Sequence, residues 1–197
     1  MQIIYELSWL WTLLGIALAA AAVCVAAAAL IARASQKRLG KKTAVLIGDV
    51  TVGRDSSIWF NTVLRGDVNS ITVGDRTNIQ DGTVIHTLYD GAPHPSQTHI
   101  GNDVSIGHNA TIHGAIIEDN CLIGMGATVL DNAVVASGCI VAAGALVLSG
   151  AKLEPNSVYA GVPARKVKEI TPEQREEIIL RIARDYRMYA SWYEEGK

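Results

Sequence analysis

Aliphatic residues recur at every sixth position through most of residues 43–168. The longest run consists of Ile117, Ile123, Val129, Val135, Val141, Val147 and Leu153, and shorter runs are Val52, Ile58 and Leu64; Val73, Ile79 and Ile85; and Ile100, Ile106 and Ile112. The fifth position of each unit in the longest run is small: Cys121, Ala127, Ala133, Cys139, Ala145 and Ala151. A period of six does not fit a helix, whereas a short strand and a corner repeat naturally, and three strands close a triangular coil. The pattern predicts a mainly β, parallel β-helix of hexapeptide repeats.

A different pattern begins after the last hexad, in residues 169–197. Thr171-Pro172-Glu173-Gln174 combines an N-cap, a first-turn proline and a capping-box glutamine. Apolar residues then follow at helical spacing: Ile178, Ile179, Ile182, Tyr186, Tyr189 and Tyr193. We therefore predict a C-terminal amphipathic helix that covers its own β-helix or a neighbouring subunit.

Residues 1–42 share nothing with the repeat. The stretch 7–31 is apolar and uncharged, and as a helix it would span about 37 Å, enough to cross about 30 Å of hydrocarbon. Aromatic residues precede it, and five basic residues follow it: Arg33, Lys37, Arg38, Lys41 and Lys42. This arrangement predicts a transmembrane helix at 7–31 with a basic linker, which tethers a cytoplasmic protein to the inner face of a membrane. A cleaved signal peptide ending at Ala34 and a non-native start are the alternatives.

Charge and cysteine content narrow the classes of partner. The net charge is −2 and no broad basic face is evident, so nucleic acid is not an expected partner. The three cysteines lack the spacing of a zinc ribbon or a CxxC pair, which favours a reducing compartment. Cys121 and Cys139 are one coil apart and are expected to be stacked core thiols.

Counting coils brings polar residues together in two columns. If residues 87–99 bulge from a corner, Leu64, Ile85 and Ile112 begin the same face of successive coils. The next residue of each, Arg65, His86 and His113, then forms one column. By the same count, Gln80 and Asp81 stack beneath His108 at a different corner.

The histidine spacing indicates a metal. Two imidazoles on coils about 4.8 Å apart can converge on one cation, whereas His108 lies across a face and would have to come from a neighbour. A three-fold symmetric homotrimer meets this requirement. Three neutral imidazoles with an open position are typical of zinc that activates water, so metal-bound hydroxide is the implied nucleophile. For any one of these histidines alone, the simpler interpretation is a residue at a coil corner that hydrogen-bonds to solvent.

The chain resembles the γ-class carbonic anhydrase family over roughly residues 45–193. The segments that carry the resemblance are LRGDVNSITVGDRTNIQDGTVIH, IGHNATIHG, LIGMGATVLD and VYAGVPAR. The resemblance implies a left-handed β-helix that hydrates CO2 to bicarbonate, with Zn or Fe(II) bound by His86, His108 and His113.

The same resemblance implies roles for six further residues. Gln80 would orient the hydroxide, Arg65 and Asp67 would form an ion pair between subunits, and Asp81, Asn78 and Tyr159 would surround the metal ligands. Each has a simpler alternative: the ion pair could only fasten the trimer, Asn78 could shape a corner, and Tyr159 could be a packing residue.

The sequence departs from the family pattern where protons would leave the site. Val68 follows RGD in place of a glutamate-bearing acidic loop, and the 87–99 loop offers only Asp90, His94 and His99. Either histidine could carry protons near neutral pH, or both could be ordinary loop residues.

Two other functions remain open. One is a non-catalytic, metal-stapled scaffold that associates with a respiratory complex, as similar subunits do in mitochondrial complex I of some lineages. The other is a hexapeptide acyltransferase with a single histidine base, which the RGD and NIQD segments and the additional histidines disfavour.

Overall fold

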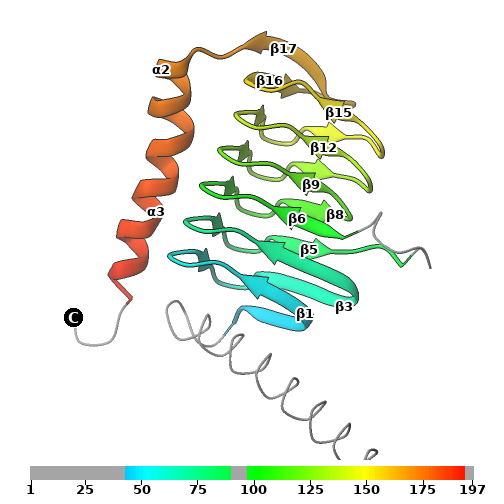
Figure 1. The fold of residues 1–197 in the computed structure, drawn as a ribbon, viewed down its shortest axis with the longest axis vertical. Helices are drawn as coiled ribbons and strands as arrows, with labels where there is room; N and C mark the ends of the chain where they lie inside the picture. Colours follow the sequence, from blue (N-terminus) through cyan, green and yellow to red (C-terminus); the bar gives the residue numbers. More distant parts are fainter. Residues whose placement is uncertain (1–42, 90–96, 194–197) are drawn as a thin grey trace, which may run out of the picture.

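The protein, described by a computed structural model over residues 43–89 and 97–193, is a parallel β-helix flanked by a C-terminal helix (Figure 1). Residues 1–42, including the predicted membrane helix at 7–31, lie outside the described residues. Within the described ranges, no helix is both long enough and apolar enough to cross a membrane.

Three faces form each coil. The first face contains the leading parts of β1 (Val45–Val52) and β3 (Val63–Val73), followed by β5 (Val84–His86), β8 (Thr111–His113), β11 (Thr128–Val129) and β14 (Leu146–Val147). The second contains the trailing parts of β1 and β3, then β6 (Thr98–Ile100), β9 (Ile116–Ile117), β12 (Val134–Val135) and β15 (Lys152–Leu153). The third contains β2 (Ser57–Ile58), β4 (Asn78–Ile79), β7 (Ser105–Ile106), β10 (Leu122–Ile123), β13 (Ile140–Val141) and β16 (Ser157–Ala160), with β17 (Arg165–Glu169) antiparallel to β16.

The interior is a set of aliphatic columns, as the hexad pattern predicts. Ile85, Ile112 and Val129 stack in register on the first face and are fully buried. Cys121 and Cys139 are also buried with free thiols, which confirms them as core residues. Burial raises the pKa of the Cys121 thiol to about 12, so the group stays protonated at neutral pH.

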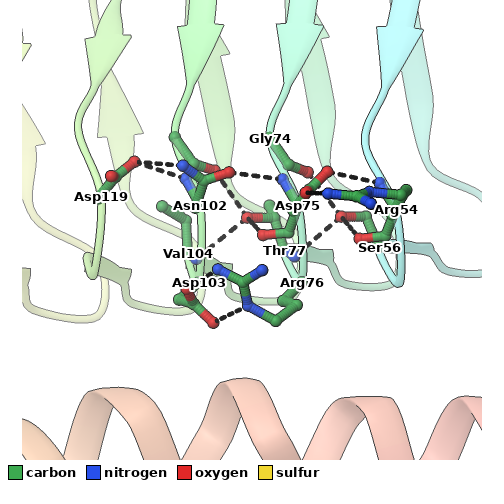
Figure 2. A network of polar contacts seen from close by, with 11 residues as sticks. Arg54, Ser56, Gly74, Asp75, Arg76, Thr77, Asn102, Asp103, Val104 and Asp119 are labelled. Atoms are coloured by element: carbon green, nitrogen blue, oxygen red, sulfur yellow. Dashed lines mark hydrogen bonds and ion pairs between the residues drawn. The ribbon is translucent and has the colours of Figure 1, made fainter.

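At one corner of the coils, side-chain oxygens accept backbone N–H groups that would be bonded to a neighbouring strand elsewhere in the sheets. Figure 2 shows this series of hydrogen bonds along the corner between the second and third faces. Asp75 accepts the backbone N–H of Arg54 at 2.7 Å, Asn102 accepts that of Asp75 at 2.8 Å, and Asp119 accepts that of Asn102 at 2.7 Å. Each coil is thereby tied to the next where the backbone turns, which satisfies donors that no strand partner reaches.

The C-terminal segment is helical, as expected, but is not a uniform α-helix. Thr171 and Gln174 form the predicted capping box at the start of α2 (Pro172–Gln174). A π-helical turn, η1 (Arg175–Leu180), precedes α3 (Arg181–Ser191). The helix runs back along the solenoid (Figure 1) and contacts β2 and β4, with Ile179 and Ala183 buried. It thus covers part of the third face.

Two glycines test how tightly the coils stack. A Cβ at Gly124 would lie 2.4 Å from the backbone nitrogen of Ala143 in the next coil, whereas one at Gly126 would meet nothing within 4 Å. Gly124→Ala should therefore lower the denaturation midpoint strongly. Gly126→Ala should lose only about 1–2 kcal/mol, the cost of an L-residue in its left-handed conformation.

Gly126→Asn is the matched control for this comparison. Asn109, Asn120 and Asn132 occupy corners with φ values of 57°, 56° and 58°, so asparagine should be tolerated at Gly126 better than alanine. Equal midpoints for Gly124→Ala and Gly126→Ala would contradict this account of coil stacking.

Candidate metal centre

Arg65, His86 and His113 form one column, as the register predicts. Arg65 pairs with His86 between β3 and β5, and His86 pairs with His113 between β5 and β8. The column lies at the corner between the first and second faces, called here the His113 corner. His86 Nδ1 and His113 Nε2 face each other at 3.0 Å, so two ring nitrogens converge on one point.

Two carboxylates hold the outer nitrogens of these imidazoles. Asp67 Oδ1 lies 3.2 Å from His86 Nε2, and Asp131 is hydrogen-bonded to His113 Nδ1. Arg65 Nη1 donates to Asp67 Oδ2 at 2.8 Å, and this hydrogen bond holds the pKa of Asp67 below its usual value. Arg65 and Asp67 thus pair within one chain, whereas the predicted ion pair joins two subunits.

His108 lies at the corner between the third and first faces, called here the His108 corner. Its Nδ1 lies 2.9 Å from Asp81 Oδ2, one coil away, which confirms the expected stacking of these two residues. Its Nε2 lies 3.2 Å from the Tyr186 hydroxyl of α3. Burial, together with the Asp81 carboxylate, raises the pKa of Tyr186, so this hydroxyl is a neutral donor.

Buried polar residues connect the third face to the His108 corner. Gln80 Nε2 donates to Asn78 Oδ1 at 3.0 Å, and Asn78 Nδ2 donates to Ser105 Oγ at 2.8 Å. Gln80 and Asn78 are 5% and 1% exposed. Both amides are therefore fixed in orientation, which a residue that directs a polar ligand requires.

An aromatic pocket opens beside His108. It has a volume of about 310 Å³ and is lined by Trp59, Phe60, Asp81, His108, Tyr186, Tyr189, Trp192 and Tyr193. The rings of Trp59 and Tyr186 pack edge to face with centroids 5.2 Å apart. The imidazole thus borders a largely apolar space.

Other predicted residues lie elsewhere in the fold. Tyr159 is on β16, three strands beyond β7 along the third face, or about 14 Å at about 4.8 Å per coil. Its hydroxyl accepts the backbone N–H of Glu154, so the structure brings it to neither histidine corner. His99 is exposed on β6, while Asp90 and His94 lie outside the described residues.

One chain does not bring the three histidines together. His108 precedes β8 and His113 is the last residue of that strand, so the two residues lie at opposite corners of the first face. No group of three His, Cys, Asp or Glu side chains within residues 43–89 and 97–193 is placed to hold a metal ion. Two potential ligands meet at the His113 corner, and the third is at the far end of the first face.

The chain has relatives among named proteins. A profile of the bacterial transferase hexapeptide family (six repeats) matches residues 97–131 and 114–149. A protein from Methanocaldococcus jannaschii named "Probable carbonic anhydrase" is 57% identical over 137 residues, which are 70% of this chain and 83% of that protein. Gamma carbonic anhydrase 1, mitochondrial, of Arabidopsis thaliana is 48% identical over 67% of this chain. The chain belongs to the γ-class carbonic anhydrase family.

Relatives within and around this family differ in length and in name. The match spans only 48% of the Arabidopsis protein, about half its length. A solved structure from Bacillus cereus, described as a candidate acetyltransferase, is 36% identical with a TM-score of 0.70, covering 79% of this chain and 90% of that one. The β-helix of the γ-class carbonic anhydrase family is therefore shared with proteins named as acyl transferases.

Two residues that contact the histidines, Tyr186 and Asp131, are not among the predicted site residues. Extending the column count by one coil, where Val129 pairs with Ile112, reaches Leu130, and Asp131 is the next residue, so the count locates the segment but not the contact. Tyr186 could not be located by any such count, because its contact with His108 depends on how the C-terminal helix docks.

The substitution Tyr186→Phe tests how much the hydrogen bond between the Tyr186 hydroxyl and His108 Nε2 contributes to stability. The phenylalanine ring keeps the packing on Trp59 but loses the hydroxyl at His108 Nε2, so the free energy of unfolding should fall by about 0.5–1.5 kcal/mol. Tyr189→Phe is the control, since the Tyr189 hydroxyl has no hydrogen bond to any other residue that the structure describes. Equal urea midpoints for the two variants would show that the Tyr186 hydrogen bond contributes nothing to docking.

Proposed function

We propose that this protein catalyses the reversible hydration of CO2 to bicarbonate at metal sites formed between copies of the chain. His86 and His113 of one copy and His108 of the next would hold Zn or Fe(II). The observation that carries the proposal is the 3.0 Å approach of His86 Nδ1 and His113 Nε2, with His108 separated from them on the same chain.

The residues fit such a metal. Tetrahedral zinc with about 2.0–2.1 Å to each nitrogen needs two ligand nitrogens about 3.3 Å apart, close to the separation found here. Three neutral imidazoles leave one position open, which distinguishes catalytic from structural zinc. When bound, such a metal lowers the pKa of its water to about 7 and so supplies a nucleophile at neutral pH.

The surrounding residues orient and isolate this chemistry. Asp81 holds His108 through Nδ1, and the buried Gln80 amide is fixed next to that corner. The aromatic pocket beside His108 offers CO2, an apolar substrate, a path with few competing polar groups. The Arg65–Asp67 pair is available to the neighbouring copy at the His113 corner. We assign no role to Tyr159.

Assembly and location belong to the same proposal. A homotrimer with three-fold symmetry places the His113 corner of each copy against the His108 corner of the next. Residues 7–31 would tether the protein to a membrane. They lie outside the described part of the chain.

Stopped-flow CO2 hydration by the purified chain, loaded anaerobically with Zn or Fe(II), tests the activity. We expect activity in the loaded wild type, and none above the metal-free control in His108→Ala, because removal of one imidazole dismantles the ligand set. Asp103→Asn is the control: it breaks an ion pair with Arg76 at 2.6 Å and should leave hydration unchanged.

Two results would assign another function. One metal per chain without hydration above the metal-free control would indicate the metal-stapled scaffold. Binding of acetyl-CoA, measured by calorimetry, would favour an acyl transferase, since CO2 hydration has no use for that ligand.

A further inference from the structure

Asp131 reaches His113 from the coil that follows. Asp131 lies at the His113 corner just after β11, and β11 pairs in register with β8. Its carboxylate accepts a hydrogen bond from His113 Nδ1, and the two side chains are 26% and 29% exposed. The backbone of Asp131 has a separate partner, because its carbonyl accepts the N–H of Gly150 at 2.8 Å. The carboxylate is therefore not needed to close this corner.

This contact decides where the imidazole proton sits. An ionised carboxylate only accepts hydrogen bonds, so neutral His113 carries its proton on Nδ1 and a lone pair on Nε2. That lone pair points at His86 Nδ1, 3.0 Å away. Asp67 acts on the other ring in the same way, through His86 Nε2 at 3.2 Å. The two carboxylates thus leave His86 Nδ1 and His113 Nε2 as two acceptors that face one point. The Arg65 guanidinium, a cation that only donates, lies 3.3 Å from His86 Nδ1 in this structure, in keeping with an unprotonated Nδ1.

We propose that Asp131 is a positioning residue: it holds His113 in the Nδ1-protonated tautomer and so prepares Nε2 to bind the metal. The inference rests on the metal site of the proposed function but not on CO2 hydration. Carboxylates that hold a ligating imidazole in this way typically raise metal affinity by about 10- to 100-fold.

The tautomer is measured first, in the metal-free wild-type chain labelled with ¹⁵N-histidine. Long-range ¹H–¹⁵N correlation spectra at about pH 8.5, where imidazoles are neutral, distinguish protonated from unprotonated ring nitrogens. We expect His113 to be protonated on Nδ1, with its signals assigned by their loss in His113→Ala. A wild-type His113 protonated on Nε2 would overturn the proposal without any Asp131 variant.

Zinc affinity is measured next, by competition with a chelator. Asp131→Asn should weaken binding about 10- to 100-fold and mix the tautomers, because the amide can present either a donor or an acceptor to Nδ1. Asp131→Glu keeps a carboxylate and should lose less. Asp103→Asn, which breaks an inter-coil ion pair remote from any histidine contact, should bind zinc as the wild type does.

The outcomes separate this inference from the proposed function. Unchanged zinc affinity and tautomer in Asp131→Asn would refute the positioning role, whether or not the wild type hydrates CO2. Dependence of the tautomer and of zinc binding on Asp131, in a wild type that does not hydrate CO2, would uphold the positioning role and refute the proposed function. A purely stabilising role would lower the denaturation midpoint of Asp131→Asn and leave the tautomer unchanged.

Discussion

The structure depends on the in-register stacking of parallel coils. Strands of successive coils pair residue to residue, about 4.8 Å apart, and their aliphatic side chains fill the interior. Since the coils cannot slip without exposing those aliphatic residues, a side chain that follows a buried residue is fixed in a column. Arg65, His86 and His113 are juxtaposed for this reason, although the first and the last lie 48 positions apart in the sequence.

Stacking also explains which parts of the site could be predicted. The Arg65–His86–His113 column and the Asp81–His108 contact follow from counting hexads, because the register leaves one arrangement. Asp131 does not follow from this count, because the residue in column with His113 is Leu130, and the Asp131 contact depends on how the side chain turns at the corner. Tyr159 was assigned through a motif at the end of the solenoid, and the structure places it about three coils from β7.

The C-terminal helix was predictable in existence but not in docking. Its capping box is local, so the four residues Thr171–Gln174 are sufficient to locate the start. The π-helical turn at Arg175–Leu180 shifts the residues that follow, and the contact of Tyr186 with His108 is a tertiary result. A uniform helical pattern could not have shown either feature.

The same rigidity that aligns two histidines keeps the third away. A coil corner cannot bend to carry His108 across the first face, so the proposed site needs a second copy of the chain. The most direct test combines His108→Ala and His113→Ala chains, co-expressed with different tags and purified through both. The account predicts that neither variant alone binds zinc, and that mixed trimers regain about one site in three, because one interface then pairs an intact His108 with an intact His113. Mixed assemblies that bind no zinc, while the wild type binds one per chain, would contradict it.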